Sequence, residues 1–289
     1  MTWSRLLRFL PPNSTTPLLG EPVNEAQDVG LATLNGEEVK VAVFSGSSVL
    51  SPGEKTGRVE VVERLLSPLA MEEVGTIRCI GLNYIKHAQE AGMPLPKVPV
   101  LFLKPSTALS DPYPSPTPIP RPFVKDDAAD YESELCVVIG QKCRDVSEQE
   151  AMGYVLGYTA SNDVSSRVAQ LEQSQWCYGK GQDGACPIGP TIVSTNAIPD
   201  YTQLHMRGLL NNTLVQSTKL DDLIFSIPQI IAFLSKGTTL LPGTLILTGT
   251  PAGIGWAMNP KGTLKDGDEF KVEILPLVGT LVNRIEFEK

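Results

Sequence analysis

The chain of 289 residues is long enough for one large domain or for a large and a small one, and 42% of its residues are hydrophobic, so it can bury a substantial core. Its 24 Lys and Arg against 32 Asp and Glu give a formal charge of −8, which argues against a nucleic-acid partner because such proteins need clustered basic residues. No window approaches about 18 consecutive apolar residues, so no membrane partner is expected.

The cysteine and histidine counts narrow the kinds of site that the chain can hold. Five cysteines, an odd number without CxxC spacing, argue against a disulfide framework or a zinc knot. They favour a reducing compartment, so we expect a cytoplasmic protein. Only two histidines are present, which excludes a metal site built from several imidazoles.

The first residues have two interpretations. The segment Ser4–Leu10 is expected to be an edge strand that ends at a pair of prolines. The alternative is a mitochondrial presequence, because Arg5 and Arg8 precede the first acidic residue, Glu21.

Residues 1–70 are predicted to form a small N-terminal α+β domain, followed by a larger domain over residues 71–289. The segment Glu38–Phe44 alternates polar and apolar residues, as a half-buried strand does. A helical stretch, Val61–Leu66, is expected to link the two domains.

Longer apolar segments follow residue 77. The expected strands are Arg78–Gly81, Val100–Leu103, Leu135–Ile139, Tyr154–Ser161, Thr191–Val193, Leu245–Thr248 and Phe270–Ile274. The expected helices are Tyr84–Ala91, Ser147–Ala151, Ser166–Trp176 and Ile227–Leu234. Many strands with few helices indicate a mixed, β-rich α+β fold and not a doubly wound α/β sheet. The segment Ser110–Pro122 holds six prolines and is expected to be an irregular surface loop.

The sharpest local signal is a pair of glutamates two residues apart. If the segment is a strand, Glu132 and Glu134 point to the same side, with Cα atoms ~6.6 Å apart, ahead of the apolar Cys136 and Val138. Two carboxylates on an apolar face are costly unless they are paired or bind a cation. A solvated strand end is the alternative.

A third carboxylate follows the next buried strand. Asp163 comes after Gly157–Asn162 and is interpreted either as a metal ligand or as the N-cap of the following helix. Two glutamates and one aspartate make an all-oxygen site, which suits Mg²⁺ or Mn²⁺ and leaves positions for water and substrate.

A histidine and a glutamate lie three residues apart in a predicted helix. Asn83 is expected to cap this helix and Gly92 to end it, so that His87 and Glu90 are close enough to touch. A carboxylate beside an imidazole orients the ring and raises its basicity, which prepares a general base. An incidental pair on a solvated helix is the alternative.

Three further polar residues have only weak local signals. Arg167 and Gln170 share one helix face, and Lys180 lies in a glycine-rich stretch. From the residues alone they are interpreted as exposed, although a lysine there can bind a substrate carboxylate or stabilise an enolate.

Together these segments resemble the fumarylacetoacetate hydrolase family. The resemblance covers most of the chain from Arg78 onward, and it is specific because of the order and spacing of the motifs. The motifs are Gly81–Tyr84 with His87 and Glu90, Phe102–Pro105, Glu132–Leu135, Asn162–Arg167, Lys180–Gly181, Cys186–Pro190, Leu241–Gly243 and Thr248–Gly255.

The resemblance implies a catalytic domain of mixed sheets rolled into a barrel-like core, a small N-terminal domain and a homodimer. It implies Mg²⁺, Mn²⁺ or Ca²⁺ as cofactor and a small 2-oxo acid or 1,3-dicarbonyl compound as substrate, transformed through a stabilised enolate. The implied metal ligands are Glu132, Glu134 and Asp163, the implied catalytic residues are His87, Glu90 and Lys180, and the implied substrate-binding residues are Arg167, Gln170, Lys104 and Thr250.

Two departures from the family pattern leave the substrate open. Val168 stands where relatives usually carry Asp, and Gly184 where many carry Thr. Carbon–carbon bond hydrolysis, decarboxylation and tautomerisation all fit the same residues. The alternatives are a diene-dioate isomerase, a tailoring enzyme of a secondary-metabolite pathway, and a non-catalytic binding protein with this fold.

Overall fold

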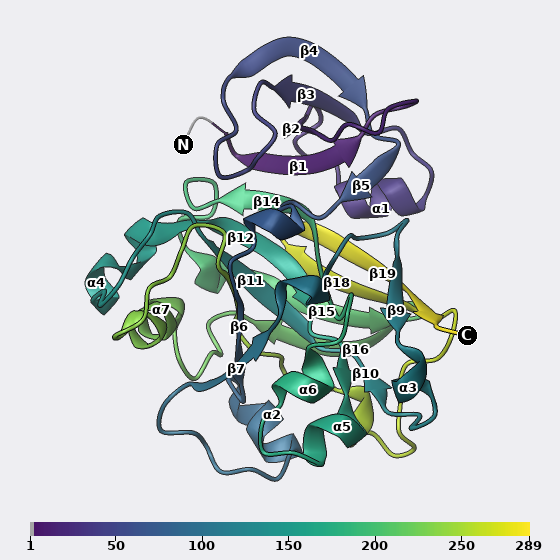
Figure 1. The fold of residues 1–289 in the computed structure, drawn as a ribbon, viewed down its shortest axis with the longest axis vertical. Helices are drawn as coiled ribbons and strands as arrows, with labels where there is room; N and C mark the ends of the chain where they lie inside the picture. The colour runs from purple at the N-terminus through teal and green to yellow at the C-terminus, as the bar shows by residue number, and fades with distance from the viewer. Residues whose placement is uncertain (1–2) are drawn as a thin grey trace.

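Two β-sheets dominate residues 3–289, the part of the chain that the computed structural model describes (Figure 1). The larger sheet has twelve strands along the order β4-β3-β2-β1-β14-β12-β11-β17-β6-β7, with β5 paired to β1 and β8 to β14. Its strands are β1 (Arg5–Leu10), β2 (Leu18–Pro22), β3 (Lys40–Phe44), β4 (Lys55–Val61), β5 (Arg64–Leu66), β6 (Ile77–Gly81), β7 (Val100–Lys104), β8 (Leu109–Ser110), β11 (Ser133–Ile139), β12 (Val155–Asn162), β14 (Cys186–Ser194) and β17 (Leu245–Leu247).

The second sheet has five strands in the order β16-β15-β18-β19-β9, and a short ribbon pairs β10 with β13. These strands are β9 (Pro116–Ile119), β10 (Ala129–Asp130), β13 (Ser165–Ser166), β15 (His205–Leu210), β16 (Thr213–Lys219), β18 (Glu269–Leu275) and β19 (Gly279–Phe287). The helices are short: α1 (Val29–Leu34), α2 (Ile85–Glu90), α3 (Arg121–Val124), α4 (Glu148–Ala151), α5 (Arg167–Leu171), α6 (Cys177–Lys180) and α7 (Ile227–Ser235). The predicted β-rich mixed fold is confirmed, but neither sheet closes into a barrel within residues 3–289.

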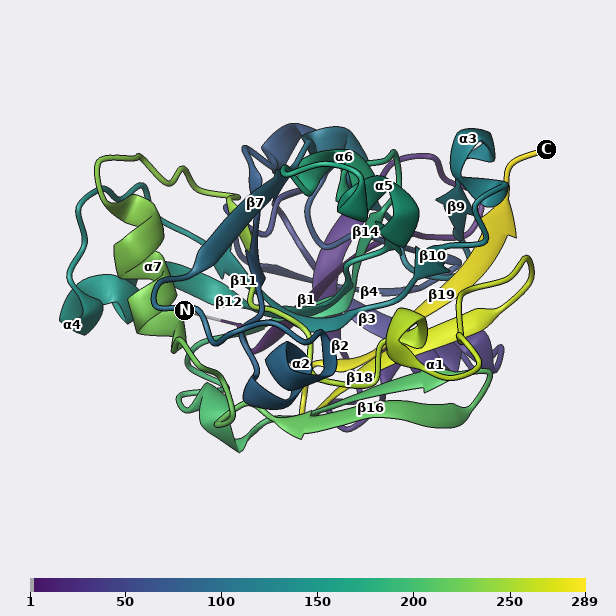
Figure 2. The same ribbon diagram turned by 90° about the horizontal axis from the view of Figure 1, so that it is seen from below.

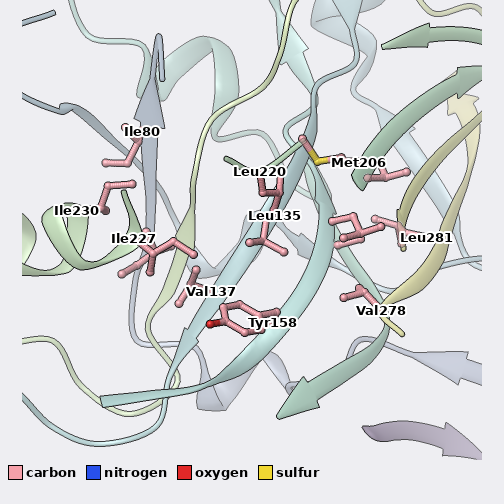
Figure 3. Close-up of a cluster of buried hydrophobic side chains, with 14 of the residues drawn as sticks. Ile80, Leu135, Val137, Tyr158, Met206, Leu220, Ile227, Ile230, Val278 and Leu281 are labelled. Carbon is pink, nitrogen blue, oxygen red and sulfur yellow. The ribbon is translucent and has the colours of Figure 1, made fainter. Parts of the chain in front are cut away.

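The main core lies between the two sheets, and β11 is buried on both of its faces. Leu135 and Val137 of β11 pack in one cluster with Met206 of β15 and Leu281 of β19 (Figure 3). The alternate residues Cys136 and Val138 join a second apolar cluster on the opposite face. Since Glu134 alternates with Leu135, its side chain lies on the Cys136 face, as the sequence pattern predicted.

The N-terminal residues form a module at one end of the molecule (Figure 1). Some of their apolar side chains form a cluster of their own, drawn from positions 7 to 65, while others, such as Leu6 and Phe44, join the cluster that contains Cys136. The predicted first strand is present as β1, but it is not an edge strand, because it pairs with β2 and β14 on its two sides. The expected helix Val61–Leu66 is wrong: β5 pairs there with β1. The domain boundary near residue 70 stays a prediction.

The proline-rich segment is more regular than expected. Its prolines alternate, and Pro116–Ile119 form β9, which pairs in parallel with β19. The strand is compatible with proline because β9 is the edge of its sheet, where one side needs no backbone donors.

The predicted helix Ser166–Trp176 begins as expected, with Ser166 before the first residue of α5, but its end is wrong, because α5 ends at Leu171 and α6 begins only at Cys177. The two short helices pack against each other, so the chain reverses between them. This reversal returns Lys180 to the neighbourhood of Arg167.

The other strands and helices expected after residue 77 are present with shifts of a residue or two at their ends, except that the expected strand Thr191–Val193 is part of the longer β14, which begins at Cys186. Within the described part of the chain, no helix has the length and apolar character needed to cross a membrane.

Candidate active site

A cavity of about 280 Å³ opens beside α2, α5 and α6, at the end of the molecule away from the N-terminal module (Figures 1 and 2). Most of the polar residues singled out from the sequence lie around it. The polar residues that line it are His87, Glu90, Glu132, Glu134, Arg167, Gln170, Lys180 and Thr250.

The three predicted metal ligands converge. One carboxylate oxygen each from Glu132, Glu134 and Asp163 lies within 4.8 Å of the others, and all three side chains are buried. The pairing of β11 with β12 brings them together, because Ser133 is opposite Asn162 and the Asp163 N–H donates to the Glu132 carbonyl at 2.9 Å. Asp163 is not a helix N-cap, since α5 begins four residues later with Ser166 at that position.

Two lysines hold the aspartate between them. Lys180 Nζ donates to Glu132 Oε2 at 2.8 Å and to Asp163 Oδ2 at 2.9 Å. Lys104 Nζ lies 2.7 Å from the other oxygen, Asp163 Oδ1, and also donates to the carbonyls of Val164 and Ala185. Lys104 is fully buried behind Asp163 and outside the cavity lining, so the expectation that it contacts substrate does not fit this geometry.

Arg167 is a second basic residue that binds Glu132. Its Nη1 lies 2.6 Å from Glu132 Oε1 and donates to Gln170 Oε1 at 3.0 Å, and its Nε donates to Asp130 Oδ2 at 2.8 Å. Asp130 was not identified from the sequence, although it precedes Glu132 by two residues and shares its strand periodicity. Arg167 and Gln170 are buried, so the interpretation as an exposed helix face is wrong.

The charges of this buried cluster do not balance. Three basic side chains meet four carboxylates: Lys104, Arg167 and Lys180 against Asp130, Glu132, Glu134 and Asp163. We call these seven side chains the buried charge cluster.

Glu134 carries the unbalanced charge. Among the described residues it forms no ion pair, and its Oε2 accepts a hydrogen bond from the Gly249 N–H at 2.7 Å. Burial, followed by repulsion from Asp163 and Glu132, raises the pKa of Glu134 well above its ordinary value. Lys180 and Arg167 instead hold the pKa of Glu132 low against the effect of burial. An additional cation beside Glu134 would restore the balance, and three converging carboxylates are the donors that Mg²⁺ and Mn²⁺ prefer.

The predicted histidine–glutamate pair is present at the cavity wall. His87 Nδ1 lies 3.1 Å from Glu90 Oε2, and Glu90 Oε1 accepts from the Gly253 N–H at 2.9 Å. Gly92 ends the helix with a left-handed φ of 65°, as predicted. Asn83 is not its cap: the Asn83 side chain donates to the carbonyls of Phe225 and Thr248 and so ties the start of α2 to the loop after β17.

Thr250 lines the cavity, and its hydroxyl is fixed by two hydrogen bonds. Its Oγ1 donates to the Ser133 carbonyl at 3.0 Å and accepts from Gln216 Nε2 at 2.8 Å. Gln216, which the sequence did not single out, also accepts from the Ser133 N–H. These bonds fix the loop after β17 relative to β11.

The two departures from the family pattern lie outside the cavity lining. Gly184 has a φ of 72°, and a Cβ there would lie 2.6 Å from Pro118 Cγ. Glycine at this position therefore accommodates the proline-rich segment, and the departure belongs to that local structure. Nothing in the structure explains Val168.

The comparisons agree with these motifs. The sequence profile described as fumarylacetoacetate (FAA) hydrolase C-terminal matches residues 76–286. The chain is 42% identical over 293 aligned residues to the caffeoylpyruvate hydrolase of Neonothopanus nambi, covering 100% of this chain and 95% of that one. It is 36% identical to the mitochondrial oxaloacetate tautomerase fahd2 of Xenopus laevis over 264 residues, which cover 91% and 78% of the two chains. The crystal structure of a 2-hydroxyhepta-2,4-diene-1,7-dioate isomerase from Mycobacterium marinum matches with a TM-score of 0.80 and 32% identity over 99% of both chains.

Proposed function

Because the chain belongs to the fumarylacetoacetate hydrolase family, as its motifs predicted, we propose that it is a divalent-metal-dependent hydrolase of acylpyruvates. An acylpyruvate is a 2,4-dioxo acid, and the bond to be cleaved joins its C3 and C4 atoms. One observation carries the proposal: three buried carboxylates converge within 4.8 Å, and the cavity beside them is also lined by an imidazole–carboxylate pair.

We assign the cation to Glu132, Glu134 and Asp163, with Mg²⁺ as the physiological ion and Mn²⁺ or Ca²⁺ as substitutes. When bound, it would polarise the 2-oxo group and offset the negative charge that develops on the enolate. Lys180 and Arg167 each hold one of the two carboxylate oxygens of Glu132, so they fix the orientation of this carboxylate.

Arg167, Gln170 and Thr250 are assigned to the substrate's polar end. Arg167 Nη2 is buried and has no hydrogen-bond partner within residues 3–289, so this donor is available for a carboxylate or enolate oxygen. Lys180, which also lines the cavity, supplies a second positive charge close to the developing enolate. Lys104 is assigned a positioning role, because it holds Asp163 and does not line the cavity.

His87 is assigned as the general base. With Glu90 accepting the Nδ1 proton, the ring presents Nε2 as the proton acceptor. Glu90 is itself held by the Gly253 N–H, so the ring orientation depends on two successive hydrogen bonds.

In the proposed reaction, His87 takes a proton from water, and the hydroxide oxygen bonds to C4 of the substrate. The C3–C4 bond then breaks, and its electron pair stays on C3 as the enolate of pyruvate. C3 regains a proton, and the products are pyruvate and the carboxylate of the acyl group. No oxidant or reductant is consumed.

The walls of the cavity favour an acylpyruvate, which has one carboxylate, over a dicarboxylate such as oxaloacetate. Apart from His87, the basic residues that line the cavity are Arg167 and Lys180, and both are already ion-paired. A second carboxylate on the substrate would therefore face apolar side chains, where an unpaired charge is costly.

The test is hydrolysis of 2,4-dioxopentanoate by metal-free protein before and after addition of Mg²⁺, followed by diketone absorbance and by the appearance of pyruvate and acetate. We expect turnover only with the cation. A folded Glu132→Ala/Glu134→Ala variant that keeps full activity in chelator contradicts the proposal. Parallel assays with oxaloacetate and fumarylacetoacetate separate hydrolysis from decarboxylation and tautomerisation, and absence of turnover with every substrate favours a binding protein.

We also propose that the protein is a homodimer and that it is located in the cytoplasm. Light scattering of the purified protein tests the first, and the distribution of the tagged full-length chain between cytoplasm and mitochondria tests the second.

A further inference from the structure

The cavity has a second half that the proposed reaction does not use. Besides the polar residues, its lining includes a wall of apolar and aromatic side chains: Phe102, Trp176, Ile254 and Trp256. At its mouth lie two exposed apolar side chains, Leu171 with an exposed fraction of 67% and Met93 with 43%. Exposed apolar side chains that face one cavity mark a place where a ligand can cover them.

Trp176 is the centre of this wall. It lies in the reversal between α5 and α6, and its half-buried ring meets Phe102 edge to face, with centroids 5.6 Å apart at 63°. The Phe102 ring in turn lies 5.0 Å from Lys180 Nζ. The aromatic wall therefore begins directly beside the buried charge cluster.

The position of the indole depends on the residue at the end of β6. Gly81 also lines the cavity, and a Cβ built on it would lie 2.3 Å from Trp176 Cζ3. That distance is far below a carbon–carbon contact, so any side chain at position 81 displaces the indole ring. Gly81 and Trp176 thus form one unit that sets the shape of the apolar half.

We propose that this half is a subsite for a planar, apolar acyl group, such as a benzoyl or cinnamoyl group, and that Trp176 determines the preference for it. The inference rests on the proposed acylpyruvate hydrolysis. With the dioxo acid end at the carboxylates, the acyl group extends along Phe102 and Trp176, where aromatic rings attract one another beyond their buried area. None of the four side chains of this wall is charged, so a charged tail would lose hydration without gaining an ion pair from them.

The test compares kcat/KM for 4-phenyl-2,4-dioxobutanoate and for 2,4-dioxopentanoate. We expect the wild-type protein to favour the phenyl compound by about 10-fold or more, the range that a well-fitted apolar group gives. Trp176→Ala and Gly81→Ala are expected to lower this ratio by about 10-fold, because both alter the wall without removing a charged group.

A matched pair of exposed leucines provides the control. Leu171→Ser removes an apolar side chain at the cavity mouth, whereas Leu214→Ser removes one on β16, outside the cavity lining, with an exposed fraction of 54%. Only the first is expected to lower the substrate ratio. Equal loss for both substrates in Trp176→Ala, or better turnover of a carboxylate-ended tail such as that of fumarylacetoacetate, overturns the subsite.

Binding distinguishes failure of the subsite from failure of the proposed reaction. If the wild-type protein hydrolyses neither compound, acylpyruvate hydrolysis is wrong, and calorimetric titration with the same two compounds in Mg²⁺ decides the subsite. Tighter binding of the phenyl compound that disappears in Trp176→Ala supports it. Equal affinities overturn it.

Discussion

The two sides of the cavity are built in different ways. On one side, the buried charge cluster comes from β10, β11, β7, α5, α6 and the end of β12, and all its members except Glu134 hold one another through ion pairs that are almost fully buried. On the other side, His87 and Glu90 come from one six-residue helix, α2, which is held through Asn83 and through the Gly253 N–H.

This contrast separates stability from turnover. Removing one ion-paired member of the buried charge cluster leaves an uncompensated charge in the core, which the protein cannot solvate. Removing His87 leaves only the carboxylate of Glu90, whose side chain still has access to water. We therefore expect the cluster to control folding and metal affinity, and α2 to control the rate of the reaction.

The largest expected effect is on turnover. His87→Asn is predicted to lower kcat by about 10²- to 10⁴-fold, the usual contribution of a general base, with the melting temperature and Mn²⁺ affinity almost unchanged. Steady-state kinetics measures kcat, and calorimetry measures the melting temperature and the affinity for Mn²⁺. His205→Asn is the control, because His205 is exposed on β15 and its side chain forms a hydrogen bond only with Ser217 among the described residues. Comparable activity of the two variants would remove His87 from the mechanism.

The next effect is on stability. Lys104→Met should lower the free energy of unfolding by about 3–5 kcal/mol, because Asp163 then keeps a buried charge with one counter-ion fewer. Lys55→Met is the matched control, since Lys55 also lies 2.7 Å from a carboxylate, that of Glu21, but its side chain is 56% exposed. It should cost less than about 1 kcal/mol. Denaturant titration compares them, and equal losses would contradict the importance of burial.

Glu134→Gln tests the unbalanced charge. Since Glu134 forms no ion pair among the described residues, its amide should leave the metal-free protein as stable as the wild type or more stable. The same change should weaken Mn²⁺ binding by about 100-fold or more, beyond what loss of an outer hydrogen-bond partner costs. Calorimetry and thermal unfolding without metal measure both. Wild-type affinity for Mn²⁺ would exclude Glu134 as a ligand.

The smallest effect concerns the thiols. Cys177, at the start of α6, is exposed, whereas Cys79, Cys136, Cys143 and Cys186 are buried. Burial raises the pKa of Cys186 to about 11, so its thiol stays protonated near neutral pH. One thiol should react rapidly with a disulfide reagent in the native protein and five after unfolding. Rapid reaction of several thiols would mean that the sheets open more readily than this packing implies.

The sequence alone predicted the parts of the site that depend on spacing. Glu132 and Glu134 share a side because strand side chains alternate, and His87 meets Glu90 because helical residues three apart are neighbours. These relations are local, so the backbone period determines them before any tertiary contact forms.

Burial and partners were decided only by the tertiary structure. Arg167, Gln170 and Lys180 had the local pattern of exposed residues, and the chain reversal between α5 and α6 buries them against carboxylates from another strand. The same packing turned Lys104 away from the cavity and made Asp130, which the sequence analysis had not identified, a partner of Arg167. Strand pairing likewise placed β1 in the interior of a sheet and placed the proline-containing strand β9 at the edge of the other sheet. The sequence gives the charge of a residue and its position in a helical or strand pattern. The counter-ions of that residue come from segments dozens of residues away, so only the folded structure determines which charges are paired.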